Sequence, residues 1–123
     1  MEGDIYRYYN PNPEKYRVGD CVIRALCKAF DQEWDPVYLI LSAYGFSCKN
    51  MPSGNHVWGR LLADRGYKRH IMDCDCTVED FAVSHQKGTY ILALDGHVVC
   101  CKDGHYYDSW DSGEEIPLYY WEK

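Results

Sequence analysis

The sequence predicts an α+β domain in which N-terminal helices pack on a C-terminal antiparallel β-meander. Apolar residues recur at helical spacing through the first two-thirds of the chain, and after that the period becomes two. Two Asp-Gly dipeptides in the later part separate apolar runs, a pattern typical of tight hairpin turns. At 123 residues the chain has the length of one compact domain. We predict a single domain over 1–123, with an irregular arm at 1–19, a mainly helical half at 20–86 and a sheet half at 87–123.

The composition is that of a globular protein, with 46% hydrophobic and 26% charged residues. The formal net charge is −6, from 13 basic and 19 acidic residues, and the sequence has no basic stripe that would bind phosphates. We therefore expect no nucleic-acid partner. The longest apolar stretch, residues 37–46, is interrupted by Ser42 and Gly45 and is too short to cross a bilayer. We expect no membrane partner either.

The first two predicted helices are defined by their caps. A helix over about residues 21–30 follows Asp20 as N-cap, and it is apolar on two faces, which predicts burial. The second helix has Asp35 as its cap and Pro36 at its first position, where proline is favoured. It is expected to stop at Gly45, since glycine commonly ends a helix.

Two more helices and four strands complete the prediction. A helix begins near Ser53 and ends at Gly66, and a short one is indicated by Thr77 with Asp80 three residues later, a variant of the capping box. Alternation of apolar and polar residues between turns then predicts the meander. Its strands are expected at 89–94, 97–102, 105–110 and 116–121.

Seven cysteines are present, and the polar, aromatic start of the sequence lacks the apolar region of a secretory signal. Thiols without an export signal favour a reducing compartment over a disulfide framework, so we expect a cytoplasmic location. Cysteine in an apolar pattern is usually a small core residue. The residues expected in the core are Cys27, Cys100 and Cys101, whereas Cys48 falls in a polar loop.

Cys74 and Cys76 are expected to be loop thiols just before the fourth helix. His70 and His85 lie near them in the sequence, which leaves a zinc site as an alternative. The spacing is not the usual Cys-x-x-Cys, and no second ligand pair is visible. We therefore expect no metal and no cofactor.

Cys21 stands at the first position of the first predicted helix. Unpaired N–H groups and the helix dipole at that position favour a thiolate, and they lower the pKa of the thiol. The neighbouring Asp20 opposes this effect unless capping turns its side chain away. The alternative is a small buried residue in a helix turn. Position alone thus makes Cys21 a candidate nucleophile.

His97 is the histidine with a predicted partner. A two-residue turn after Lys102 would pair Cys101 with Tyr106 and His97 with Trp110, which places His97 and Asp108 on one face as diagonal neighbours. A carboxylate there would orient an imidazole that acts as a base. The alternative is a solvated hairpin face, because a one-residue slip in register moves the carboxylate away.

Three segments together resemble a minimal papain-like cysteine peptidase: G-D-C-V-I-R-A-L at 19–26, G-H-V-V at 96–99 and Y-D-S-W at 107–110. The pattern is similar to the peptidase domains of bacteriocin exporters and to small bacteriophage and prophage proteins with the same Cys, His, Asp order. The resemblance implies a papain-like fold with Cys21 as nucleophile, His97 as general base and acid, and Asp108 as the orienting carboxylate. It also implies an acyl-enzyme and a peptide or protein substrate.

Two positions depart from the family pattern. Papain-like peptidases place a glutamine shortly before the cysteine to help form the oxyanion hole, and this sequence has none there. Asn10 and Asn12 in the arm are candidate donors, and the backbone N–H of Cys21 is the alternative. Val22 follows the cysteine where relatives often have glycine.

Three functions are compatible with these observations. The first is a cysteine peptidase that cleaves a peptide or isopeptide bond in the cytosol, including the host cytosol for a phage-encoded protein. The second is an amidase on cell-wall peptides, like the NlpC-type hydrolases. The third is a catalytically weak or inactive papain-like binding module that engages a host protein. Twelve tyrosines and four tryptophans suit an interface, but they suit a substrate groove equally well.

Overall fold

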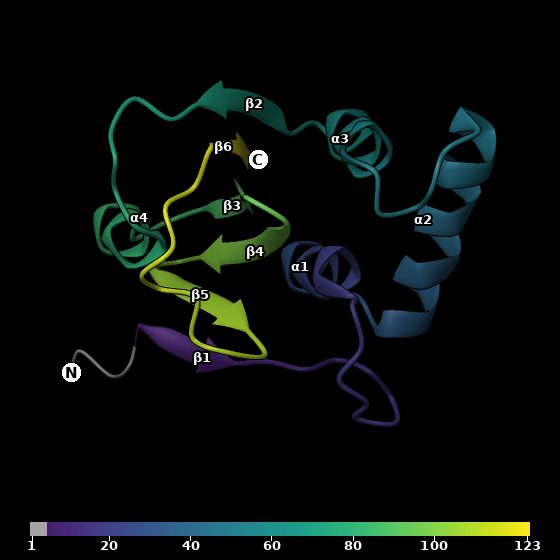
Figure 1. Ribbon diagram of the computed structural model, residues 1–123, viewed down its shortest axis with the longest axis horizontal. Helices are drawn as coiled ribbons and strands as arrows, with labels where there is room; N and C mark the ends of the chain where they lie inside the picture. The colour runs from purple at the N-terminus through teal and green to yellow at the C-terminus, as the bar shows by residue number, and fades with distance from the viewer. Residues whose placement is uncertain (1–4) are drawn as a thin grey trace.

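The computed structural model describes residues 5–123 (Figure 1). Over this range the fold is α+β, with four helices and one six-stranded mixed sheet. The helices are α1 (Cys21–Phe30), α2 (Trp34–Cys48), α3 (Asn55–Asp64) and α4 (Val78–Ser84). The strands are β1 (Tyr6–Tyr8), β2 (Lys68–Ile71), β3 (Thr89–Leu94), β4 (His97–Lys102), β5 (His105–Asp108) and β6 (Tyr119–Glu122). Within the described residues, no helix combines the length and the apolar character that crossing a bilayer requires.

The strands lie in the order β1-β5-β4-β3-β6-β2. β3, β4 and β5 form the predicted hairpins, and the pairing of Cys101 with Tyr106 confirms the predicted register of the second hairpin. The turn of this hairpin has positive φ at both central residues, Asp103 and Gly104, which is the geometry that Asp-Gly favours.

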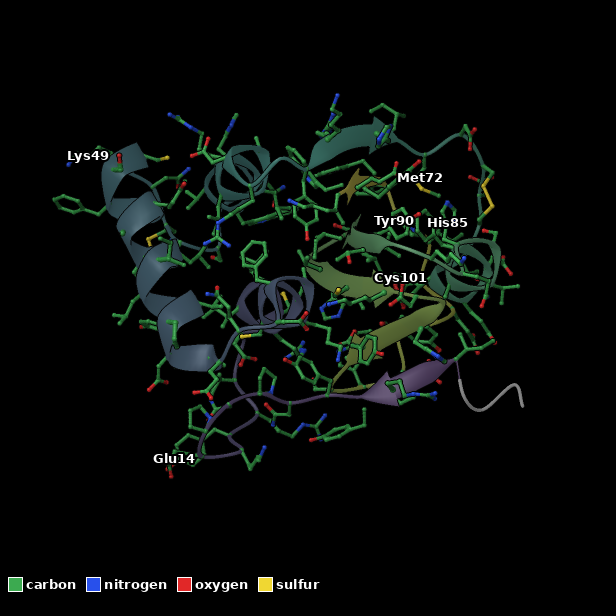
Figure 2. All side chains as sticks on the ribbon, turned by 180° about the vertical axis from the view of Figure 1, so that it is seen from behind. Glu14, Lys49, Met72, His85, Tyr90 and Cys101 are labelled. Atoms are coloured by element: carbon green, nitrogen blue, oxygen red, sulfur yellow. A yellow bond between two sulfur atoms is a disulfide. The ribbon has the colours of Figure 1, made fainter. Side chains whose placement is uncertain are left out.

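Each face of the sheet carries its own apolar core because side chains alternate along β3 and β4. α1 and α3 cover one face, with α2 packed on their outer side (Figure 1), and Ile91 and Cys100 are fully buried on this face. α4 covers the other face (Figure 1), where Leu92 and Cys101 are buried. Figure 2 shows the side chains on the α4 side, where the rings of His85 and Tyr90 pack edge to face at 4.9 Å.

A purely antiparallel C-terminal meander is the part of the predicted fold that is wrong. β1, which lies in the predicted irregular arm, pairs parallel with β5, and β2 lies in the predicted helical half. β6 pairs with β3 rather than with β5, so the chain crosses the sheet before its last strand. β1 and β2 have three and four residues and carry charged side chains, which is typical of edge strands and too short a pattern to recognise. The first four residues of the predicted arm lie outside the described residues.

The helix predictions are correct in number and differ at their ends. α1 has the predicted bounds, and the capping box of Thr77 and Asp80 is confirmed at α4. α2 begins at Trp34 and continues through Gly45 to Cys48. Gly45 does not end the helix. It lets the loop after α2 pass close to the helix backbone, since an added Cβ would lie 2.9 Å from the carbonyl oxygen of Asn50.

Candidate active site

Cys21, His97 and Asp108 are brought together from three elements. Cys21 begins α1, His97 begins β4 and Asp108 ends β5. Because α1 packs across β4 and β5, the start of the helix lies against the start of the hairpin. These three residues are the predicted nucleophile, base and orienting carboxylate.

The His97 ring is held by Asp108. Nε2 of His97 donates a hydrogen bond of 2.7 Å to Oδ2 of Asp108. The same carboxylate oxygen accepts a 2.6 Å hydrogen bond from the Ser112 hydroxyl, and Oδ1 accepts the backbone N–H of Ser109 at 2.8 Å. Asp108 is completely buried. These bonds fix both the carboxylate and the tautomer of His97, which leaves Nδ1 available to Cys21.

The thiol of Cys21 lies beside the His97 ring and the backbone of Val98 at one end of α1, and hydrogen bonding to these two groups is among the effects that lower its pKa. Burial is the largest single effect on the Cys21 pKa and raises it, but these bonds and the charges of His97 and Arg24 together lower the pKa below its ordinary value. Burial likewise opposes the charged form of His97. The bonds and charges of Asp108 and Cys21 outweigh it and raise the His97 pKa to about 9. Opposite shifts of this kind favour a thiolate–imidazolium pair at neutral pH.

Asp108 stays ionised despite its burial. Desolvation alone would raise its pKa, but the hydrogen bonds from His97 and Ser112 and the charges of His97 and Arg24 hold the pKa below its usual range. The Trp110 side chain packs against the imidazole of His97, and the centroids of the two rings are 4.9 Å apart. The imidazole is therefore fixed by a buried anion and an aromatic side chain.

Asp20 does not cap α1 with its side chain. Its carboxylate instead accepts hydrogen bonds of 2.9 Å from Arg24 Nη1 and from the indole N–H of Trp34. Arg24 also contacts Asp108, with Nη2 3.1 Å from Oδ1. The predicted opposition between Asp20 and a Cys21 thiolate is thus offset by a cation that Asp20 shares with Asp108.

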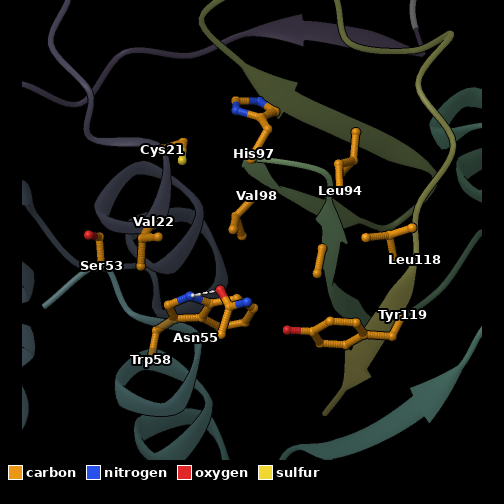
Figure 3. Close-up of a pocket in the computed structure, with 12 residues that line it drawn as sticks. Cys21, Val22, Ser53, Asn55, Trp58, Leu94, His97, Val98, Leu118 and Tyr119 are labelled. Atoms are coloured by element: carbon orange, nitrogen blue, oxygen red, sulfur yellow. Dashed lines mark hydrogen bonds between the residues drawn. The ribbon is translucent and has the colours of Figure 1, made fainter. Parts of the chain in front are cut away.

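A cavity of about 300 Å³ opens beside Cys21 (Figure 3). Cys21 and His97 lie at one end of it, and Asn55, Trp58 and Tyr119 lie at the other. The indole N–H of Trp58 donates to Oδ1 of Asn55 at 3.2 Å. The other lining residues are Val22, Ser53, Ala93, Leu94, Gly96, Val98 and Leu118. This wall is mostly apolar, and the candidate nucleophile and base are both part of it.

Asn10 and Asn12 do not line this cavity. The Asn10 amide donates to the backbone carbonyls of Lys15 and Tyr16, and the Asn12 side chain accepts the N–H of Glu14. Both amides therefore organise the arm. The remaining donors for an oxyanion are backbone N–H groups in the first turn of α1, which have no partner within a helix.

The other free cysteines differ from Cys21. Burial raises the pKa of Cys27 and Cys101 to about 12 and raises that of Cys100 further. Cys27, Cys100 and Cys101 are core residues, as predicted. Cys48 is exposed.

Cys74 and Cys76 form a disulfide, so the prediction of two loop thiols is wrong. With one residue between them, the two sulfur atoms are close enough to bond when the connecting loop is bent, and neither is then a thiolate ligand for zinc. Within residues 5–123, no group of three or more histidine, cysteine and acidic side chains is arranged to hold a metal ion.

Two residues of the site were missed from the sequence. Arg24 lies four residues after Asp20 on the predicted helix, a spacing that signals an ion pair and could have been noticed. Ser112 lies two residues beyond the predicted end of its strand and reaches Asp108 only through the turn after β5. No protein-family model, curated protein or solved structure matches this chain.

Proposed function

We propose that this protein is a papain-like thiol hydrolase, a cysteine peptidase or amidase that forms an acyl-enzyme on Cys21. One observation carries the proposal: Cys21 and His97 lie together at one end of the cavity, Asp108 holds the His97 ring by a hydrogen bond, and these contacts shift the pKa of the thiol down and that of the imidazole up. A nucleophile, a base and an orienting carboxylate are the three groups that this chemistry requires.

In the proposed reaction, the Cys21 thiolate attacks the carbonyl carbon of a substrate amide and forms a C–S bond. The oxyanion faces the N–H groups at the start of α1. The His97 imidazolium then gives its proton to the leaving amine, and the C–N bond breaks. His97 next takes a proton from water, whose oxygen attacks the thioester. The C–S bond breaks, a carboxylic acid leaves, and Cys21 returns to the thiolate.

The cavity beyond Cys21 is the proposed substrate site. Its apolar wall favours an uncharged part of a peptide, because an unpaired charge there would lose hydration without gaining a counter-ion. The Asn55 amide lies at the far end, and its oxygen is already occupied by Trp58. Its NH₂ group is then the donor for a substrate carbonyl.

The test is labelling with an electrophilic peptide probe for cysteine hydrolases, read by intact mass, together with hydrolysis of a peptide library that includes cell-wall peptides. The wild type should take up one probe and release an amine from at least one substrate. Cys21→Ala should lose both, and Cys48→Ala, which removes an exposed thiol outside the site, should keep both. Equal labelling of Cys21→Ala and the wild type would refute the proposal.

A second candidate is a peptide-binding module with the same fold. It is favoured by the position of Asn10 and Asn12, whose amides serve the arm and provide no side-chain oxyanion donor at Cys21. Loss of one such donor typically costs about 3–4 kcal/mol of transition-state stabilisation. Peptides that bind equally to the wild type and Cys21→Ala, without cleavage by either, would identify this alternative.

A further inference from the structure

Arg24 is a buried cation that the proposed reaction does not use directly. It has 5% of its surface exposed, and its guanidinium lies between two buried carboxylates. Nη1 is 2.9 Å from Oδ1 of Asp20, and Nη2 is 3.1 Å from Oδ1 of Asp108. A planar guanidinium can satisfy two carboxylates at fixed geometry, which a lysine ammonium does less well.

Both carboxylates belong to the candidate site. Asp20 immediately precedes Cys21, and Asp108 binds the His97 ring through Nε2, the nitrogen that faces away from Cys21. Without a cation between them, two buried anions would stand near the position where Cys21 must itself carry a negative charge. Like charges within a few ångströms disfavour ionisation.

We propose that Arg24 is a positioning residue that neutralises Asp20 and Asp108 together and so allows Cys21 to ionise beside them. The inference rests on the proposed function in taking Cys21 as the nucleophile. The positive charge of Arg24 offsets both carboxylates, and it also acts directly on the Cys21 thiol and lowers its pKa. The indole of Trp34 completes the arrangement, since it donates to the second oxygen of Asp20 at 2.9 Å and keeps that carboxylate turned toward α1 and α2.

The charged and titratable groups in this network come from β4, α1, β5 and the residue that precedes α1. His97 faces the thiol from β4, Arg24 lies one turn further along α1, and Asp108 lies on β5 behind His97. Asp20 precedes the helix. Removal of Arg24 leaves two carboxylates against one imidazolium, whereas removal of the Asp20 charge leaves one carboxylate against two cations. The two changes must therefore shift the pH at which Cys21 ionises in opposite directions.

The test is the pH dependence of iodoacetamide alkylation at Cys21, followed by mass spectrometry of the peptide that contains it. We expect Arg24→Met to raise the midpoint of this profile by about 1–3 pH units, the usual effect of a nearby charge. Asp20→Asn should lower the midpoint, and the double variant Arg24→Met/Asp20→Asn should fall between the two single variants. A role in packing alone would not reverse the sign between the two positions.

The matched control is Arg60→Met, which removes an exposed arginine whose Nε is 3.9 Å from Asp64. It should leave the midpoint unchanged. If circular dichroism shows that Arg24→Met does not fold, Asp20→Asn decides the question with its expected downward shift, and Arg24→Lys, which keeps the charge, should lie close to the wild type. A folded Arg24→Met with the wild-type midpoint, or Asp20→Asn with an unchanged or raised one, would overturn the inference.

The result also separates this inference from the proposed function. The alkylation profile does not require turnover, so it reports the state of the thiol whether or not any substrate is cleaved. A low wild-type midpoint that Arg24→Met leaves in place removes the role of Arg24 and keeps the nucleophile. A wild-type midpoint no lower than that of Cys48 removes the nucleophile itself.

Discussion

Selective alkylation of Cys21 is the sharpest consequence of the site. The pKa of Cys21 is lowered from its ordinary value of 9.0, and those of Cys27 and Cys101 are raised to about 12. At pH 7 a thiol with a pKa of 12 is ionised to about one part in 10⁵, and one with a pKa below 9 to more than about one part in 100. The thiolate populations therefore differ by a factor of at least about 10³.

The rate ratio is smaller than the population ratio. A thiolate of lower pKa is intrinsically less nucleophilic, with a slope of about 0.4–0.5 per pKa unit, which reduces the advantage by a factor of about 30. We expect Cys21 to react with iodoacetamide at least about 30-fold faster than Cys27 or Cys101 at pH 7 in the folded protein. The measurement is time-resolved peptide mapping by mass spectrometry.

His97→Ala tests the cause of this difference. Loss of the imidazole removes the hydrogen bond and the charge that lower the Cys21 pKa, and one pKa unit changes the thiolate fraction about tenfold. With the same slope in nucleophilicity, one pKa unit changes the rate about threefold, so we expect Cys21 to react at least about threefold slower in His97→Ala. His56→Ala, which removes an exposed histidine outside the cavity, should have no effect. Rates within threefold of one another for all free thiols of the wild type would refute the reasoning.

Three further outcomes follow from the same contacts. Because folding raises the His97 pKa from 6.5 to about 9, its charged form stabilises the native state fully below pH 6.5 and ceases to do so as the pH rises through 9. The advantage of the wild type over His97→Gln in urea unfolding should fall by up to about 3 kcal/mol across that interval. Ser112→Ala removes a 2.6 Å hydrogen bond to the ionised Asp108 and should lower the free energy of unfolding by about 1.5–3 kcal/mol in the same assay. Thiol titration of the denatured protein should count five groups, and seven after reduction of Cys74–Cys76.

Local signals in the sequence were enough to predict the parts of the fold that position the site. The N-terminal position of Cys21 on α1 follows from helical periodicity after Asp20, and the proximity of His97 and Asp108 follows from an Asp-Gly turn and strict alternation. Each of these depends on residues close together in the chain. That α1 packs with its start against β4 could not be derived in the same way, because it depends on the shape of two buried surfaces.

The sheet edges were beyond prediction for a related reason. β1 pairs with β5, although the two strands are about a hundred residues apart in the chain. β6 pairs with β3, on the far side of β4 and β3 from β5. Pairing at such separation is decided by which apolar faces remain uncovered after the central hairpins form, and a three-residue strand carries no periodic signal of its own. The side-chain role of Asp20 was misjudged for the same reason, since its partner Trp34 is supplied by another helix.

On the proposed function, the charged cluster around Cys21 serves the thiolate more than the stability of the fold. Buried ion pairs seldom stabilise a fold, because desolvation offsets their attraction, and apolar residues of the same volume often serve as well. Asp20, Arg24 and Asp108 are nonetheless all buried, and they surround one cysteine and one histidine at the mouth of a cavity. If stability were their role, Arg24→Met combined with Asp20→Asn would lower the free energy of unfolding and leave the alkylation rate of Cys21 equal to that of Asp20→Asn. If they serve the thiolate, the same double variant retains its fold while the alkylation rate of Cys21 at pH 7 stays below that of Asp20→Asn, and that difference is independent of any substrate.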